Sequence, residues 1–249
     1  MKFRFGETVI PVTHRDKAAV LQTAARKLRA GQGFALATIN LDHLTKLPRD
    51  AAFLKAYAAQ DIVVADGNPI VWLSRLAGHP VRLVPGSDLV VPLARAAAAA
   101  DRPLAMIGST EKALAGAAAH LTALIPDLRI GPCIAPPFGF DPEGAGARQI
   151  LAVLAATGPC LCLLALGAPK QERLAALGRT LAPEAGFASI GAGIDFLSGD
   201  QIRAPLWVRR LAMEWAWRMA QSPKRLIPRY AACAAILPRQ IWLALRQRG

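Results

Sequence analysis

Residues 160–167 read Cys-Leu-Cys-Leu-Leu-Ala-Leu-Gly, and the stretch that follows, 169–181, has the Ala/Leu-rich spacing of a helix. A short and almost continuously apolar run is typical of a strand that is buried on both faces of a parallel sheet. Five further runs have this character, at 34–40, 61–65, 81–84, 103–108 and 129–135. Helical stretches lie between them, at 41–60, 88–100, 110–125 and 142–156. This alternation predicts an α/β fold with a Rossmann-like, doubly wound and mostly parallel sheet.

Charge divides the chain into two parts. The 249 residues are 53% hydrophobic, and 30 Lys+Arg against 17 Asp+Glu give a net charge of +13. Residues 201–249 contain ten of the basic residues and a single acid, Glu214, and so carry +9. We therefore expect an α/β core over 1–200 and a basic, helical C-terminal appendage over 201–249. The excess of positive charge predicts an anionic partner, which could be a nucleic acid, an anionic membrane or a phosphorylated substrate.

The appendage has an amphipathic pattern. Apolar residues recur every four positions as Trp207, Leu211, Trp215 and Met219. Pro223 is expected to end this helix, and Pro228 and Pro238 to break the next helical stretch, 226–246. Two interpretations of the apolar stripe stay open, namely contact with an anionic membrane surface or packing on the core. Met1-Lys2 is not followed by a signal-like apolar region, and neither a spanning helix nor secretion is expected.

Cysteine and histidine usage points to no metal or disulfide framework. The cysteines are Cys133, Cys160, Cys162 and Cys233, without a CxxC pair, which favours a reducing, cytoplasmic setting. The histidines, which are scattered, are His14, His43, His79 and His120. We therefore expect no bound metal.

Polar side chains follow two of the predicted strands. Asp66 comes directly after the 61–65 run, in the turn Asp66-Gly67-Asn68-Pro69, and Thr38 and Asn40 end the 34–40 run. Carboxyl ends of parallel strands meet at one edge of a sheet, so these side chains are expected to lie together. Two roles stay open for Asp66, a general base in a crevice or a structural turn or N-cap residue.

Glycines and cations suggest a diphosphate ligand. Gly108, Gly167 and Gly191 follow apolar runs, and Gly167-Ala168-Pro169-Lys170-Gln171-Glu172 opens a helix. Neither GxGxxG nor GxxxxGK[ST] is present, which disfavours a dinucleotide oxidoreductase or a P-loop NTPase. Arginines near the C-terminus are suited to stabilising a diphosphate leaving group.

Taken together, these segments resemble the WecB/TagA/CpsF family (glycosyltransferase family 26), which includes bacterial N-acetylmannosaminyltransferases and related envelope polysaccharide enzymes. In the core, the matching residues are Thr38-Ile39-Asn40, Asp66-Gly67-Asn68-Pro69, Arg82, Gly86-Ser87-Asp88-Leu89, Gly108, Pro136-Pro137-Phe138-Gly139, Gly167-Ala168-Pro169-Lys170-Gln171-Glu172 and Gly191-Ala192-Gly193-Ile194-Asp195-Phe196. In the appendage they are Arg203-Ala204-Pro205-Leu206-Trp207, Glu214-Trp215, Arg218, Pro223, Arg225, Arg229 and Tyr230. The match follows one order from about residue 34 to residue 230.

The resemblance implies an inverting, metal-independent transfer of a sugar from a UDP donor to a polyprenyl-diphosphate-linked saccharide, with no cofactor. Asp66 would be the general base. The residues expected at the sugar and acceptor side are Thr38, Asn40, Arg82 and Gln171. Asp195 would lie beside the uridine. The expected diphosphate-side residues are Gly108, Arg203, Arg218, Arg225 and Arg229, and Gly86 and Lys170 are further expected substrate-binding residues. The appendage would bind the inner face of the bacterial cell membrane, as a peripheral protein of the cytoplasm.

Some features depart from the family or stay open. Lys224 stands where the resemblance leads us to expect arginine, and Pro85 stands where Thr is expected before Gly86. The donor could be UDP-N-acetylmannosamine, its uronic acid or UDP-glucose, and homo-oligomerisation is left open. The main alternative is a non-catalytic nucleic-acid-binding protein that uses the basic appendage, although no nucleic-acid-binding module is recognisable.

Overall fold

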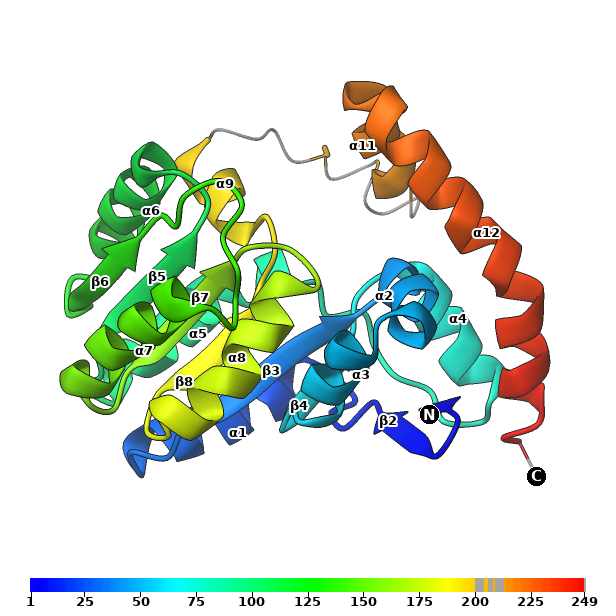
Figure 1. Cartoon of the computed structure of the whole chain (residues 1–249), viewed down its shortest axis with the longest axis horizontal. Coiled ribbons are helices and arrows are strands. Elements are labelled where there is room, and N and C mark those ends of the chain that lie inside the picture. The colour runs from blue at the N-terminus through cyan, green and yellow to red at the C-terminus, as the bar shows by residue number, and fades with distance from the viewer. Residues whose placement is uncertain (200–203, 206–207, 209–212, 249) are drawn as a thin grey trace.

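The computed structural model describes residues 1–199, 204–205, 208 and 213–248, except for the side chains of Arg218 and Arg225. The strands of its main sheet are β3 (Phe34–Ile39), β4 (Ile62–Ala65), β5 (Leu104–Gly108), β6 (Ile130–Ile134), β7 (Leu161–Ala165) and β8 (Gly186–Ser189). They lie in the order β4-β3-β8-β7-β5-β6, and all neighbouring strands are parallel (Figure 1). The predicted α/β fold with a parallel, Rossmann-like sheet is confirmed.

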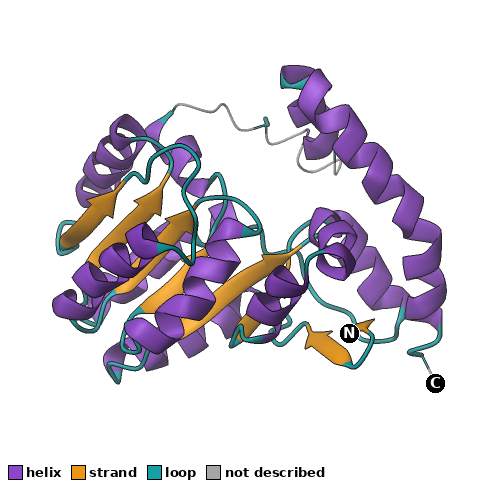
Figure 2. Cartoon of the chain, viewed as in Figure 1, coloured by secondary structure: helices purple, strands orange, loops and turns teal. Residues whose placement is uncertain are grey.

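Helices cover both faces of this sheet (Figure 2). The helices of the core are α1 (Lys17–Arg29), α2 (Leu41–Lys46), α3 (Ala51–Ala58), α4 (Asn68–Leu76), α5 (Val90–Ala99), α6 (Glu111–Leu124), α7 (Ala145–Thr157), α8 (Lys170–Leu181) and α9 (Gly193–Ser198), with short 3-10 turns η1 (Leu47–Arg49) and η2 (Gly86–Asp88). Near the C-terminus follow α11 (Glu214–Gln221) and α12 (Pro223–Leu245). A separate antiparallel hairpin is formed by β1 (Lys2–Phe5) and β2 (Thr8–Pro11).

Strand β7 illustrates how the apolar run divides between two layers. Leu161 and Leu163 pack into the core beneath α1, α5 and α6. Cys162 and Leu164 point to the opposite face and pack with α7 and α8. Successive strand residues face opposite sides of a sheet, so a run that is apolar at every position is buried on both faces. The free thiols of Cys160 and Cys162 are part of this core.

Two predictions about strands are wrong. Residues 81–84 form no strand: this segment runs past the end of β4, where Val84 N–H donates to the Ala65 carbonyl at 2.8 Å. Prolines on both sides, Pro80 and Pro85, lack the N–H groups that a ladder requires. Conversely, β8 is not among the predicted strands, because Gly186-Phe187-Ala188-Ser189 has only one large apolar side chain, although it is fully buried between β3 and β7.

Proline divides one of the predicted helices but leaves another continuous. The 41–60 stretch is divided into α2, η1 and α3: Pro48 lies in η1, and the Asp50 side chain caps α3 by accepting from Phe53 N–H at 2.9 Å. In contrast, Pro228 and Pro238 do not break α12, which is continuous. Each proline removes one backbone hydrogen bond, but α12 packs along α2 and α4 (Figure 1), and this tertiary packing holds the helix together.

The C-terminal end of α12 is also tied to the N-terminus. Gln247 accepts from Lys2 N–H at 3.0 Å and donates to the Lys2 carbonyl at 2.8 Å. Of the expected apolar stripe, Trp207 and Leu211 lie outside the described residues. Trp215 on α11 is 50% exposed, and Met219 is partly buried. None of the described helices combines the length and the apolar character that crossing a membrane requires.

Candidate active site

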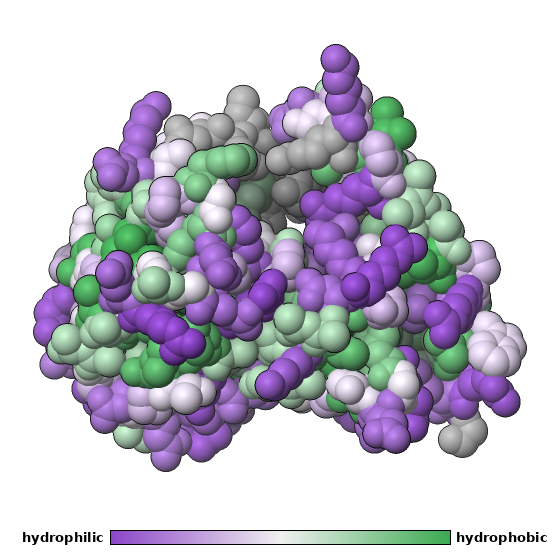
Figure 3. Space-filling model, viewed as in Figure 1, coloured by the Kyte–Doolittle hydropathy of each residue, from purple (hydrophilic) through white to green (hydrophobic). Residues whose placement is uncertain are grey.

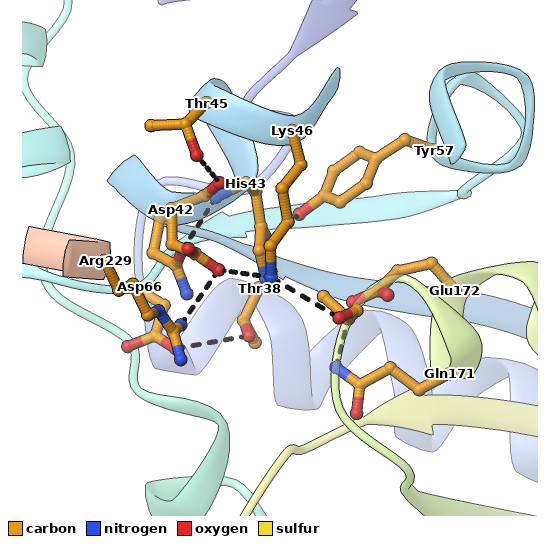
Figure 4. Close-up of polar contacts among 12 residues, drawn as sticks. Thr38, Asp42, His43, Thr45, Lys46, Tyr57, Asp66, Gln171, Glu172 and Arg229 are labelled. Carbon is orange, nitrogen blue, oxygen red and sulfur yellow. Dashed lines mark hydrogen bonds and ion pairs between the residues drawn. The ribbon is translucent and has the colours of Figure 1, made fainter. Parts of the chain in front are cut away.

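The candidate base lies at the carboxyl edge of the sheet, where ligands bind in open α/β folds. Ile39 of β3 pairs with Ala65 of β4, so the residues that follow these two strands are neighbours. The Thr38 hydroxyl donates to Asp66 Oδ2 at 3.3 Å (Figure 4). Gly67 is the N-cap residue of α4, and no side chain caps that helix. Asp66 is therefore not the N-cap residue of α4.

Asn40 follows β3 directly, next to Thr38 and Asp66, and it also caps a helix. It is the N-cap residue of α2, and its Oδ1 accepts from His43 N–H at 3.0 Å. A capping contact of this kind satisfies one of the free N–H groups at a helix start. Asn40 thus fixes the first turn of α2 directly after the strand that carries Thr38.

An ion-pair cluster joins α12 to this edge. Asp42 Oδ2 forms ion pairs with Lys46 Nζ at 2.7 Å and with a terminal guanidinium nitrogen of Arg229 at 2.9 Å (Figure 4). Asp42 is 7% exposed. Burial of a lone carboxylate is costly, and the two cations compensate for it. Of the appendage arginines expected at the diphosphate, Arg229 is therefore brought to the edge that carries Asp66.

A buried polar pair in the first turn of α8 contacts the loop after β8. Gln171 Nε2 donates to Glu172 Oε1 at 2.9 Å, and Gln171 Oε1 accepts from Gly191 N–H at 3.3 Å. Burial raises the pKa of Glu172 to about 7. Burial also raises the pKa of Tyr57, which lies near Glu172 and Asp66, well above its usual value. Gln171 is thus held at the carboxyl edge, between β7 and β8.

The other end of the edge, at β5 and β6, holds different groups. The hydroxyl of Ser109, directly after Gly108, donates to Asp195 Oδ1. An open pocket of about 400 Å³ lies where α6 begins and β6 ends. Its lining consists of Glu111, Leu114, Ala115, Cys133, Ile134 and Ala135. Asp66 and Asp195 therefore lie at different places along one edge, with β3, β8 and β7 ordered between β4 and β5.

Two of the predicted site glycines are required by packing. Gly108 has φ +114, and a Cβ there would lie 2.4 Å from the Ala165 carbonyl oxygen. A Cβ on Gly86 would lie 2.9 Å from the Ile190 carbonyl oxygen. Gly108 allows the ends of β5 and β7 to approach closely, and Gly86 allows η2 to approach Ile190 after β8. Both requirements are independent of any contact with a diphosphate.

The remaining predicted residues are spread more widely. Arg82 is exposed on the loop that follows α4, and Lys170 is the first residue of α8. Arg203 lies outside the described residues. Arg218 and Arg225 fall within α11 and α12, but their side chains are outside the described part.

In the space-filling view, a hollow with mainly hydrophilic visible walls lies between the α6–α9 side and the α2–α12 side (Figure 3).

The structure adds residues to which the sequence alone assigns no role in the site. They are Asp42, Lys46, Ser109 and Glu172. Lys46 and Asp42 are four residues apart on α2, a helical spacing that signals an ion pair but not its place beside a site. Ser109 directly follows a predicted strand-end glycine, so a search of the residues after each strand would find it. Among the described residues, no three His, Cys, Asp or Glu side chains group as metal ligands.

A Rossmann-like sheet with a carboxylate and an arginine at its carboxyl edge is the arrangement expected of an enzyme that binds its ligand at this edge. The chain belongs to the Glycosyl transferase WecG/TagA/CpsF family, whose model matches residues 8–249. It is therefore a glycosyltransferase, and the predicted family resemblance is confirmed. Membership in an enzyme family favours this class over the non-catalytic nucleic-acid-binding alternative.

Two curated relatives share one name, N-acetylglucosaminyldiphosphoundecaprenol N-acetyl-beta-D-mannosaminyltransferase. The protein from Bacillus subtilis is 26% identical over 206 residues, which cover 80% of this chain and 78% of the relative. The protein from Bacillus spizizenii is 28% identical over 190 residues, which cover 74% of this chain and 70% of the relative.

Proposed function

We propose that this glycosyltransferase moves N-acetylmannosamine from UDP to an N-acetylglucosamine that is linked to polyprenyl diphosphate. The names of both relatives support this acceptor and this sugar. The observation that carries the proposal is the Thr38–Asp66 contact at the carboxyl edge, in a chain whose α12 brings Arg229 to the same edge through Asp42. The uronic acid of this sugar and glucose are the competing donors. The product would serve bacterial cell-envelope polysaccharide synthesis.

Asp66 acts as the general base in this proposal. Its carboxylate takes the proton from the acceptor hydroxyl while that oxygen forms a bond to the anomeric carbon of the donor. The bond from the anomeric carbon to the UDP oxygen breaks, UDP leaves with the electron pair, and attack from the opposite face inverts the anomeric centre. Thr38 orients the carboxylate by donating to Oδ2. Asn40, Arg82 and Gln171 line the sugar and acceptor side.

The donor lies along the edge from Asp66 towards β5. The uridine is held near Asp195 and Ser109, next to the pocket at the start of α6. Gly86, Gly108 and Lys170 are nearest the diphosphate. The arginines that stabilise the negative charge of the departing UDP are Arg203, Arg218, Arg225 and Arg229. Guanidinium groups match phosphate oxygens in geometry and charge.

The reaction is proposed to need neither metal nor cofactor, since arginines supply the positive charge at the leaving group. Turnover in excess EDTA should equal turnover in Mg²⁺ buffer. Loss of turnover in EDTA that Mg²⁺ restores would overturn this part of the proposal.

The outer face of α12 is proposed to bind the anionic inner face of the cell membrane. Its exposed apolar residues recur at helical spacing as Ile227, Ala231, Pro238, Ile241, Trp242 and Leu245. Exposed cations, Lys224, Arg239 and Arg246, lie beside them, and the Arg246 guanidinium is 4.5 Å from the centre of the Trp242 ring. The opposite face, with Leu226, Cys233 and Ala244, is buried. Basic amphipathic helices of this kind bind anionic lipid surfaces.

The function is tested by measuring UDP release with a polyprenyl-diphosphate N-acetylglucosamine acceptor. UDP-N-acetylmannosamine should be used faster than UDP-N-acetylmannosaminuronic acid and UDP-glucose, and release should require the acceptor. Equal or faster release with either competing donor would reject the proposed sugar. Release that does not depend on the acceptor would reject the transfer.

A further inference from the structure

Asp42 is a buried carboxylate that serves two cations at once. Lys46 Nζ and the Arg229 guanidinium approach the same oxygen, Oδ2, at 2.7 and 2.9 Å. The two cationic side chains stay 38% and 43% exposed, while the Asp42 side chain is 9% exposed. One negative charge against two positive charges leaves the cluster with an excess of +1 that faces outwards.

The cluster lies beside the candidate base. Asp42 is in the first turn of α2, the helix that follows the strand carrying Thr38. Lys46 Nζ also reaches the Ala168 carbonyl, at 3.5 Å, in the loop that leads to Gln171. Figure 4 shows the charged ends of Lys46 and Arg229 together with Thr38 and Asp66 in one group of side chains. Lys46 belongs to the core, whereas Arg229 comes from α12.

An ion pair that only attached α12 to α2 would not need two cations. One cation is enough to pair with a carboxylate, and both cations would then be expected to turn inwards. Lys46 and Arg229 instead keep exposed surface beside the base, and ammonium and guanidinium groups carry several donors each. Charge-assisted hydrogen bonds from such donors bind phosphate oxygens strongly.

We propose that Asp42 positions Lys46 and Arg229 as a pair of cations for one diphosphate group, and that Lys46 is a substrate-binding residue. This inference rests on the proposed function, in which two diphosphates reach the site. One belongs to the UDP-sugar, and the other links the acceptor saccharide to its polyprenyl chain. Asp42 acts through the two cations and touches neither substrate.

The first test compares Lys46→Met with Lys55→Met, which makes the same change at an exposed lysine on α3. In Lys46→Met, the KM for one diphosphate substrate should rise about tenfold or more, because a charge-assisted contact is lost. A rise in the donor KM together with weaker UDP binding by calorimetry assigns the pair to UDP. A rise in the acceptor KM with unchanged UDP binding assigns it to the acceptor.

Binding of inorganic pyrophosphate to the full chain separates this inference from the proposed function. If no tested donor turns over, weaker pyrophosphate binding by Lys46→Met than by Lys55→Met still supports the cation pair. The inference is overturned if the two variants have KM values and pyrophosphate affinities within about twofold of each other, the scatter expected from a surface change.

The positioning role of Asp42 is tested by a double-mutant cycle. Asp42→Asn should raise the same KM as Lys46→Met does, and should raise it less when Lys46 is already Met, because only its effect through Arg229 then remains. Equal effects of Asp42→Asn in both backgrounds would contradict positioning of Lys46. If Asp42→Asn does not fold, the partly exposed Lys46→Met variant decides the outcome alone.

Discussion

At the residue scale, the Thr38 hydroxyl orients the carboxylate of the proposed base, Asp66. The Thr38 side chain is buried, with 4% exposure, and it fixes one oxygen of the Asp66 carboxylate. Thr38→Val keeps the shape of the side chain and removes the donor. We expect kcat to fall about tenfold, because a hydrogen bond to a charged group contributes roughly 1.5 kcal/mol. Thr122→Val, at an exposed position on α6, is the control and should leave kcat unchanged.

Glu172 should make stability depend on pH. Burial raises its pKa from 4.5 to about 7, so the folded protein keeps a proton that the unfolded chain loses. Its contribution to the free energy of unfolding therefore falls as the pH rises from 4.5 to about 7, by on the order of 3 kcal/mol. His43 acts in the opposite sense: burial lowers its pKa from 6.5 to about 3, so its contribution rises with pH over that range.

The contributions of Glu172 and His43 to stability change over overlapping pH ranges. The Glu172 contribution is therefore obtained from the difference in unfolding free energy between wild type and a Glu172 variant. Urea unfolding of wild type and Glu172→Gln should be measured from pH 4.5 to 8. The stability of Glu172→Gln relative to wild type should increase with pH up to about 7 and then level off. The His43 contribution cancels because both proteins contain it. Parallel stability curves would show that Glu172 does not titrate in this range.

At the scale of elements, close contact between strand ends depends on Gly108 at the end of β5. Gly108→Ala adds a Cβ 2.4 Å from the Ala165 carbonyl oxygen, at a φ of +114. Gly158→Ala is a matched control, because Gly158 also has a positive φ, +75, but has nothing within 4 Å of its Cβ. We expect Gly108→Ala to cost at least about 2 kcal/mol more than the control in urea unfolding. Equal losses would mean that the strand ends relax freely.

The elements that the sequence predicts correctly are those with strong local signals. Apolar runs identify β3, β4, β5, β6 and β7, and turn residues place Thr38 and Asp66 at the same edge. β8 escapes prediction because burial comes from its neighbours rather than from its own small side chains. The continuity of α12 through Pro228 and Pro238 also depends on tertiary packing, which no local pattern reveals. The same holds for Asp42, whose partner Arg229 is 187 positions further along the chain.

At the scale of the whole molecule, α12 has two roles. Its outer face carries exposed apolar and basic side chains, and Arg229 on the same helix pairs with Asp42 at the edge that carries Asp66. We expect the protein to co-sediment with vesicles that contain phosphatidylglycerol and less with neutral phosphatidylcholine vesicles. Binding should weaken as salt screens the cations. Ile241→Ser combined with Trp242→Ser should reduce binding several-fold, because both apolar side chains are exposed on that face.

The control for vesicle binding is Leu181→Ser, which alters an exposed apolar residue on α8. It should bind vesicles as wild type does. If the Ile241 and Trp242 changes have no more effect than this control, α12 is not the membrane-binding face.

The central claim is that Asp66 is the base that deprotonates the acceptor. Its most direct test is kcat for UDP release by Asp66→Asn, with the donor KM measured in parallel. Asparagine keeps the shape of the side chain but cannot take up the proton, so kcat should fall by about 10²–10⁴ while the donor KM changes little. A kcat equal to that of wild type would contradict the account.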